Sequence, residues 1–213
     1  MPRAMLFVNG ELPDPAAART IIQPDDVLIA ADGGARHITQ LGLTPSVIIG
    51  DMDSLSAEEL NIFNKLGVRI LRYPAHKDET DLELALDHAL KASYSPIILV
   101  AALGGRLDQT LGNLALLADP ACLAADVRLN DGLTEAFFIT SQATLRGQPG
   151  EIVSLLPWGA PVEGVTTDGL SYPLHSETLL PYRTRGISNE MLSDTAIVSV
   201  KRGTLLCVHH HKP

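Results

Sequence analysis

The stretch IIGDMDSL, residues 48–55, places a glycine and two acids directly after an apolar run. Such a run is typical of a buried strand, and ligands of an open α/β sheet bind at the carboxyl ends of its strands. If the backbone stays extended, Asp51 and Asp53 point the same way, and oxygen ligands of this kind suit Mg²⁺ beside phosphate oxygens. The alternative is local: Asp53 or Ser54 caps the following helix while Asp51 is solvated.

The first half of the chain repeats this pattern of a short apolar run followed by a helix-like segment. Continuous apolar strands that alternate with helices predict a mostly parallel sheet covered on both faces. The expected strands are residues 4–9, 27–31, 47–50, 68–73 and 97–103. The expected helices are residues 15–22, 35–41, 57–66, 81–92 and 109–117.

The second half changes character, because the helical pattern fades and short apolar runs are separated by Gly, Pro, Asp and Ser. The runs AFFIT, EIVSLLPW, PVEGVTT, TAIVSV and TLLCVHH predict antiparallel strands in a small sandwich or barrel. With a boundary near Gly132, we predict an α/β domain over 1–132 and an all-β domain, which we take as a β-sandwich, over 133–213.

The composition limits the classes of function. The chain has 213 residues, 46% of them hydrophobic, and a formal net charge of −9. A packed core is therefore expected, whereas non-specific binding to nucleic acid or to an anionic membrane would need a basic face. The two cysteines are far apart, which argues against a disulfide framework or a zinc site. Because no apolar run approaches a membrane-spanning length, we expect a soluble cytoplasmic protein.

A second group of charged residues lies in HKDETDLELAL, residues 76–86. Lys77, Asp78, Thr80 and Asp81 are crowded between a predicted strand and a helix, and Thr80 with Glu83 fits a capping box. Lys77 is suited to bind phosphate as a point charge. Alternatively, Asp81 only compensates the helix dipole and Lys77 pairs with Asp78.

Two glycine pairs occupy similar places, in ADGGARH (31–37) and LGGRLDQTLGNL (103–114). Glycines between a strand and a helix allow a phosphate to approach the backbone amides at the helix N-terminus, although a tight turn explains one such pair alone. In the second stretch Arg106 is suited to contact phosphate and Asp108 to cap the helix. Four strand ends that each carry Gly or Asp favour a shared binding site over independent caps.

Taken together, ADGGA, GDMDS, KDETDLELAL and GGRLDQTLGN, in this order and spacing, resemble the thiamine pyrophosphokinase family. The segments GVTTDGLSYPL (164–174) and GISNEM (186–191) resemble the thiamine-binding part of that family. The resemblance implies a nucleotide- and Mg²⁺-binding α/β domain, a thiamine-binding β-sandwich, and a homodimer whose active sites are shared between subunits. It also implies transfer of the pyrophosphoryl group of ATP to the hydroxyl of thiamine, which gives thiamine diphosphate and AMP.

Residue roles follow from the resemblance by motif match. It implies that Asp51, Asp53 and Asp81 bind Mg²⁺ and, with Lys77, are catalytic. It also implies that the nucleotide is bound by Asp32, Gly33, Gly34, Gly50, Ser54, Asp78, Thr80, Gly104, Gly105, Arg106, Asp108 and Asn113. The residues that it implies on the thiamine-binding side of the site are Tyr172, Ser188 and Asn189.

The chain departs from the family pattern at three positions. Gln109 stands where His is frequent, Met52 where Phe is common, and Tyr172 where some members have Trp. None of these changes removes a charge that the chemistry needs. Alternatives to the implied activity are another Mg²⁺-dependent enzyme, such as a pterin-type pyrophosphokinase or a D-x-D glycosyltransferase, and a non-catalytic nucleotide sensor.

Other aromatic and imidazole side chains are expected to have structural roles. Trp158 is predicted to pack in a core or turn rather than to stack on a ligand ring. The run of three histidines at 209–211 has the composition of a metal-binding tract, but a solvated terminal run is the preferred interpretation. His37, His76 and His88 are expected on the surface or in loops.

Overall fold

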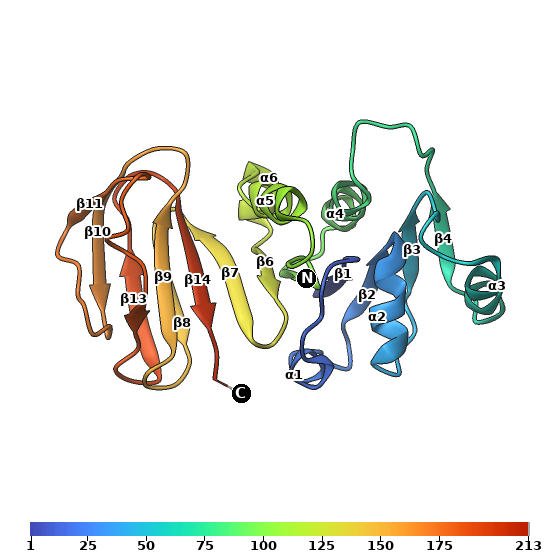
Figure 1. Cartoon of the computed structure of the whole chain (residues 1–213), viewed down its shortest axis with the longest axis horizontal. Coiled ribbons are helices and arrows are strands. Elements are labelled where there is room, and N and C mark those ends of the chain that lie inside the picture. Colours follow the sequence, from blue (N-terminus) through green and yellow to red (C-terminus); the bar gives the residue numbers. More distant parts are fainter. Residues whose placement is uncertain (213) are drawn as a thin grey trace. The chain divides into compact units, whose positions relative to one another are not determined.

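The computed structural model describes residues 1–212, which form two compact units, residues 1–132 and 133–212 (Figure 1). The first unit contains parallel strands in the order β6-β5-β1-β2-β3-β4. Their bounds are β1 Ala4–Phe7, β2 Val27–Ala31, β3 Val47–Gly50, β4 Arg69–Arg72, β5 Ile97–Val100 and β6 Val127–Asn130. Strands β1, β3 and β5 are buried along their whole length, as expected for a sheet with both faces covered.

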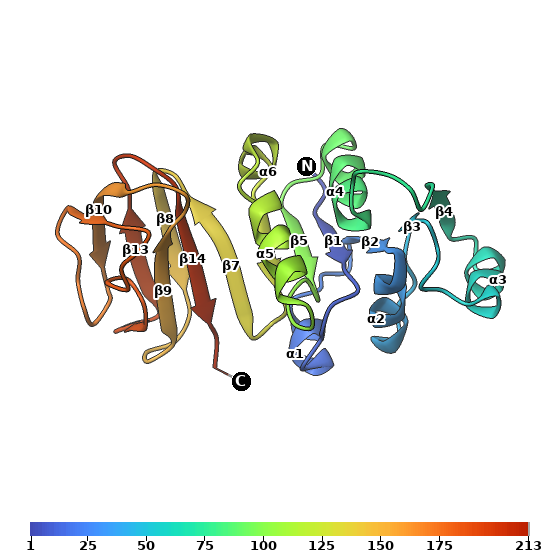
Figure 2. The same cartoon turned by 45° about the horizontal axis from the view of Figure 1, so that its top comes forward.

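Helices cover both faces of this sheet. In Figures 1 and 2, α4 lies on one side of β1 and β2, and α2 lies on the other. The bounds are α1 Pro15–Thr20, η1 Asp32–Gly34, α2 Ala35–Gln40, α3 Ala57–Lys65, α4 Asp81–Lys91, α5 Leu107–Leu116 and α6 Pro120–Ala124. Helix α4 has one apolar face, on which Leu82, Ala85, Leu86 and Ala89 are buried. In contrast, none of the ten residues of α5 is buried.

The second unit is built from two layers of antiparallel strands, so the predicted β-sandwich is confirmed. One layer has the order β12-β9-β14-β7 and the other β11-β10-β13-β8. The bounds are β7 Thr134–Ile139, β8 Gln142–Arg146, β9 Ile152–Pro157, β10 Val162–Asp168, β11 Glu177–Leu179, β12 Asn189–Glu190, β13 Thr195–Ser199 and β14 Leu205–His210. The core between the layers includes Phe137, Leu145, Val153, Leu155 and Val198.

Several short elements were not predicted from the sequence, namely β6, β8, β11, β12 and α6. Helix α6 has only five residues, and a cap by Asp119 with a proline at the first turn defines it rather than an apolar face. Across residues 1–212, the structure contains no helix with the length and apolar character to cross a membrane.

Candidate active site

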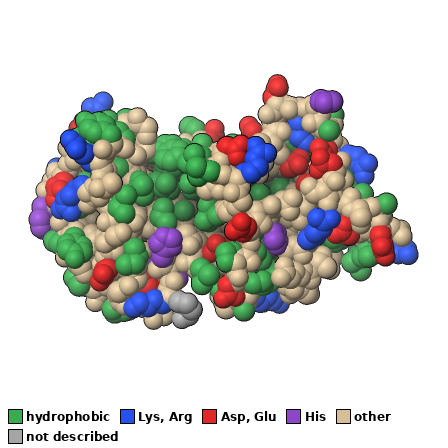
Figure 3. Space-filling view, viewed as in Figure 1, with side chains coloured by type: hydrophobic (Ala, Val, Ile, Leu, Met, Phe, Trp, Pro, Cys, Tyr) green, Lys and Arg blue, Asp and Glu red, His purple; other side chains and the backbone are tan. Residues whose placement is uncertain are grey.

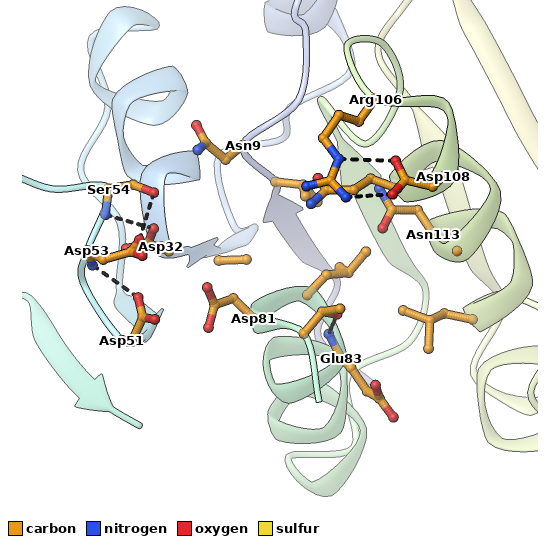
Figure 4. Close-up of a pocket in the computed structure, with 17 residues that line it drawn as sticks. Asn9, Asp32, Asp51, Asp53, Ser54, Asp81, Glu83, Arg106, Asp108 and Asn113 are labelled. Atoms are coloured by element: carbon orange, nitrogen blue, oxygen red, sulfur yellow. Dashed lines mark hydrogen bonds and ion pairs between the residues drawn. The ribbon is translucent and has the colours of Figure 1, made fainter. Parts of the chain in front are cut away.

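A cavity of about 570 Å³ opens at the carboxyl ends of the first unit's strands (Figure 4). Its walls come from the ends of β1, β2 and β3 and from the first turns of α4 and α5. Nine of the predicted site residues line it: Asp32, Asp51, Asp53, Ser54, Thr80, Asp81, Arg106, Asp108 and Asn113. Several acidic side chains gather on the upper surface of the same unit in Figure 3.

Three carboxylates converge on one side of this cavity. Asp32, Asp51 and Asp53 each offer an oxygen, and these oxygens lie within 4.8 Å of one another. The condition of an extended Asp-x-Asp backbone is not met, because Met52 has φ of 66° and the N–H of Asp53 donates to Asp51 Oδ1 at 3.0 Å. The Met52 side chain is buried in the core, and this packing holds the turn that brings the two carboxylates together.

The alternative in which these residues cap the next helix is also wrong. Helix α3 is capped by Ser56, whose hydroxyl accepts from the N–H of Glu59 while the Glu59 carboxylate accepts from the N–H of Ser56. Ser54 instead donates its backbone N–H to Asp32 Oδ2 at 3.3 Å. Because the helix is capped elsewhere, the loop carboxylates are available for a ligand.

Asp32 has the most constrained side chain of the group. It is 4% exposed and has φ of 42°, a left-handed conformation that non-glycine residues rarely adopt. Its Oδ1 is buried and has no hydrogen-bond partner among residues 1–212. An unpaired buried carboxylate oxygen is costly, and a cation would satisfy it, so the Asp32–Asp51–Asp53 set fits a divalent metal with hard oxygen preferences.

Asp81 faces the same cavity from the start of α4, after the Thr80 cap, whose hydroxyl accepts from Glu83 N–H. Lys77 Nζ lies 2.6 Å from Asp81 Oδ1, so the alternative in which Lys77 pairs with Asp78 is not supported. A Cβ at Gly50 would come within 3.0 Å of Asp81 Oδ1 and 2.9 Å of Asp32 Cβ. A glycine is therefore needed where the two acids approach the end of β3.

Arg106 and Asp108 form a bidentate ion pair at the mouth of the cavity, with N–O distances of 2.5 and 3.1 Å. This hydrogen-bonded pair raises the pKa of Arg106 and lowers the pKa of Asp108. The prediction that Asp108 caps the helix is wrong, because α5 begins at Leu107 and Arg106 occupies its N-cap position without a side-chain bond. Asn113 donates its amide to the Ala102 carbonyl at 2.7 Å.

The predicted glycines do not line the cavity, and neither do Lys77 and Asp78. A Cβ at Gly34 would lie 2.1 Å from the Phe7 carbonyl oxygen, so this glycine lets η1 pack on β1. Gly33 is similarly close to the Asn9 side chain. The N–H of Gly105, beside Gly104, donates to Glu11 Oε1 at 2.9 Å. A nucleotide role for these positions stays a prediction.

Some residues that line the cavity were missed, among them Asn9, Glu83, Gln109 and Gly112. Asn9 comes soon after β1, just as Asp32 follows β2, so the strand-end signal could have found it. Gln109 was noted only as a departure from the family pattern, yet the first turns of α5 place it in the wall.

The predicted thiamine-side residues lie in the second unit. Tyr172 is 62% exposed, whereas Asn189 is 5% exposed and pairs with the Tyr172 backbone. Ser188 donates its backbone N–H to Ser154 Oγ at 3.1 Å. Trp158 packs edge-on against Phe138 with ring centroids 5.3 Å apart, which confirms its predicted packing role.

One prediction about histidines needs correction. The tract at 209–211 is not a solvated run, because β14 extends to His210 and His209 is fully buried. His76 is exposed, and His37 and His88 are half-buried on helices α2 and α4, which agrees with the prediction of surface or loop positions. His37 Nε2 contacts the Gly10 carbonyl at 3.0 Å, and burial lowers the pKa of His88.

Comparison with known proteins relates both units to a single family. The family model described as "Thiamin pyrophosphokinase, catalytic domain" matches residues 18–129, and "Thiamin pyrophosphokinase, vitamin B1 binding domain" matches residues 142–205. Thiamine pyrophosphokinase of Bacillus subtilis is 29% identical over 182 residues, which cover 84% of this chain and 85% of that protein.

Solved structures agree with these sequence matches. The crystal structure of thiamin pyrophosphokinase from Geobacillus thermodenitrificans has a TM-score of 0.84 at 25% identity, and covers 100% of this chain and 98% of that one. The Bacillus subtilis structure has a TM-score of 0.88 at 24% identity, with 99% and 100% covered, and supports the fold. Because the catalytic-domain match spans over half of the chain and includes the acids that converge in the cavity, the chain belongs to the thiamine pyrophosphokinase family of enzymes.

Proposed function

We propose that the chain transfers the pyrophosphoryl group of ATP to the hydroxyl of thiamine, with thiamine diphosphate and AMP as products. The observation that carries the proposal is the Asp32–Asp51–Asp53 set, with its buried unpaired oxygen, in a cavity whose opposite wall carries Arg106. Mg²⁺ held by these three carboxylates, with Asp81 beside them, would neutralise the phosphates and polarise the attacked phosphorus.

The protein's own charged groups complete the reaction. The thiamine hydroxyl oxygen attacks the β-phosphorus, the bond from that phosphorus to the α,β-bridging oxygen breaks, and AMP leaves with the electron pair. Arg106, in the cavity wall, stabilises the negative charge that develops on the phosphates, and Lys77 adds positive charge from behind the wall, beside Asp81. Asp81 receives the hydroxyl proton, because it faces the cavity and is held in place by Lys77 at 2.6 Å.

The second unit is assigned to thiamine. Tyr172 exposes an aromatic face, which would attract the cationic thiazolium ring by a cation–π interaction. The family resemblance also implies that Ser188 and Asn189 contact thiamine. Asn189 positions the Tyr172 backbone through its side-chain amide. A net charge of −9 also favours a cationic substrate.

We further infer a homodimer in which each active site takes its acids from one subunit and its thiamine contacts from the other. Large hydrophobic side chains are exposed on both units, which is unfavourable for an isolated chain. They include Leu107 and Leu111 on α5, and Tyr172, Ile187 and Leu192 in the second unit. The acidic charge argues against binding to nucleic acid or to an anionic membrane, and the two distant cysteines fit a reducing, cytoplasmic compartment.

The deciding experiment incubates the purified chain with ATP, Mg²⁺ and thiamine and identifies the products. AMP and thiamine diphosphate should appear in equal amounts. ADP together with thiamine monophosphate would contradict the proposed transfer. ATP binding without turnover would favour the nucleotide sensor instead.

A further inference from the structure

A second group of metal-ligating side chains lies in the β-sandwich, where the proposed reaction makes no use of it. Along β14 the side chains of Leu205, Cys207 and His209 are all buried, and His209 ends this series. In register, His209 stands opposite Glu135 on β7 and Val153 on β9. An imidazole and a carboxylate therefore meet at one end of an otherwise apolar core.

His211 and Glu151 complete the group. Glu135, His209 and His211 each offer a ligand atom, and these atoms lie within 4.8 Å of one another. The two imidazole rings have centroids 4.2 Å apart. Glu151 Oε2 lies 2.8 Å from His209 Nε2 and 3.2 Å from His211 Nδ1.

Neither ring nitrogen of His209 has a hydrogen-bond partner among residues 1–212, although the residue is fully buried. The short approach of Glu151 to Nε2 is not aligned as a hydrogen bond, and Nδ1 has no hydrogen-bond partner in the described part of the chain. A buried polar atom in this state is costly. A cation at Nδ1 would remove that cost, while the nearby Glu151 carboxylate would orient the ring.

We propose that Glu135, His209 and His211 bind one divalent transition-metal ion, for which Zn²⁺ is the best chemical fit. Imidazole nitrogens with a carboxylate oxygen are the ligand set that Zn²⁺ takes in proteins. Glu151 approaches one nitrogen of each ring, so His209 Nδ1 and His211 Nε2 are left to face the ion. This arrangement of carboxylate, histidine and metal is the usual outer shell of such sites.

The surroundings are shaped for this group and leave a route to it. A Cβ at Gly147 would lie 2.1 Å from Glu151 Oε2 and 2.8 Å from His209 Cε1, so a glycine is required against the site. Glu151 is 3% exposed and is held by the N–H of Lys212 at 3.0 Å. The side chain of His211 is 22% exposed, which gives an ion access from solvent. The ion would link side chains of β7 and β14 with His211, in addition to the hydrogen bonds that already pair the two strands, so its expected effect is on stability.

The test titrates Co²⁺ into the metal-stripped full-length chain in excess Mg²⁺, which keeps the aspartate cavity occupied. We expect one equivalent to bind with the visible absorption of a nitrogen- and oxygen-coordinated ion, and Zn²⁺ to displace it. Substitutions His211→Gln and Glu135→Gln should each weaken binding by at least about tenfold. Saturating Zn²⁺ should raise the melting temperature of the unmodified chain and not that of His211→Gln.

His210→Gln is the matched control, because it changes the neighbouring histidine, which is exposed and contacts Thr134 Oγ1 at 3.1 Å. It should bind Co²⁺ like the unmodified chain, and so should Asp51→Asn. The proposal is overturned if no stoichiometric binding occurs at micromolar Co²⁺ or Zn²⁺. It is equally overturned if binding persists undiminished in both His211→Gln and Glu135→Gln. Either result would mean that Glu135, His209 and His211 form a polar network that binds no metal ion.

Discussion

The side-chain amide of Asn189 makes two hydrogen bonds to the backbone of Tyr172. Its Oδ1 accepts from the Tyr172 N–H at 2.9 Å, and its Nδ2 donates to the Tyr172 carbonyl at 2.8 Å. Asn189 is buried while the Tyr172 side chain is exposed, so the buried amide fixes a segment that presents an aromatic ring to solvent.

Substitution of Asn189 by Ala should therefore affect both folding and thiamine binding. The loss of two hydrogen bonds from a buried site should lower the free energy of unfolding by about 2 kcal/mol. The KM for thiamine should rise while the KM for ATP stays unchanged, because only the Tyr172 segment loosens. Thermal melts and steady-state kinetics measure these effects. An unchanged melting temperature with a raised thiamine KM would mean that Asn189 acts through direct contact alone.

Substitution of the cavity carboxylates should remove turnover without unfolding the chain. Asp32→Asn and Asp51→Asn keep the side-chain shape, and Asn tolerates the left-handed backbone at residue 32. Each should lower kcat by about 100-fold or more, since loss of even an outer-shell partner costs up to that amount. Asp87→Asn is the control, because Asp87 is exposed on α4 and pairs with Lys91. Near-normal activity of Asp32→Asn in saturating Mg²⁺ would remove Asp32 from the metal site.

The two members of the ion pair at the cavity mouth, Arg106 and Asp108, should have different effects on ATP binding when each is substituted. Arg106→Gln should raise the Kd for ATP about tenfold, because a charge-assisted contact to phosphate is lost. Asp108→Asn should not weaken ATP binding, because it frees the Arg106 guanidinium from a competing carboxylate. Calorimetric titration with a non-hydrolysable ATP analogue compares the two variants. Equal weakening by both would mean that the nucleotide binds the intact pair.

Acid stability should depend on the cap of α3. The hydrogen bond from Arg36, followed by those from Ser56, lowers the pKa of Glu59 from 4.5 to about 2. Between pH 4.5 and about 2, Glu59 is protonated in the unfolded chain but still ionised in the folded chain. The stability that the ionised Glu59 contributes is therefore complete above pH 4.5 and is lost as the pH falls toward about 2.

Glu59→Gln should accordingly lower the free energy of unfolding at neutral pH by about 1 kcal/mol and flatten its fall in acid. Glu58→Gln removes the same charge from the same helical turn without touching the cap, and should keep the acid dependence. Urea unfolding at several pH values measures the difference between the variants. Parallel curves for Glu59→Gln and the unmodified chain would contradict the prediction.

Shared active sites predict rescue between two inactive variants. Asp51→Asn and the double change of Ser188 and Asn189 to Ala each inactivate a different part of the site. In a mixed dimer one site carries both defects and the other neither, so random reassortment restores about a quarter of all sites. Activity after joint refolding measures the rescue. Proven subunit exchange without any gain in activity would rule out a shared site.

The alternation of apolar runs and helices was sufficient to predict the parallel sheet and the position of the cavity. The ends of the strands are also informative, because an acid or a glycine directly after a buried apolar run indicates either a ligand site or a helix cap. The turn at Met52 was not predictable, since a positive φ at methionine arises from burial of its side chain in the core. The local motif alone favours an extended backbone.

Other errors came from giving local features too much weight. The position of the histidines at 209–211 near the end of the chain favoured a solvated run, although the apolar run TLLCVHH that contains two of them predicts a strand. The choice of Asp81 over Asp78 as the partner of Lys77 depends on how the loop folds back onto α4. Pairing of that kind is decided by tertiary structure.

Helix α5, which has no buried residue, forms one wall of the cavity. In a single subunit, a helix stabilised by little apolar contact opens locally at low free-energy cost, so the amide protons of α5 in the monomer should exchange with solvent faster than those of α4. Substrate that contacts this wall must first order it, and part of the intrinsic binding energy is used in doing so. Slow amide exchange in α5 would thus report occupancy of the site directly, before any product is formed.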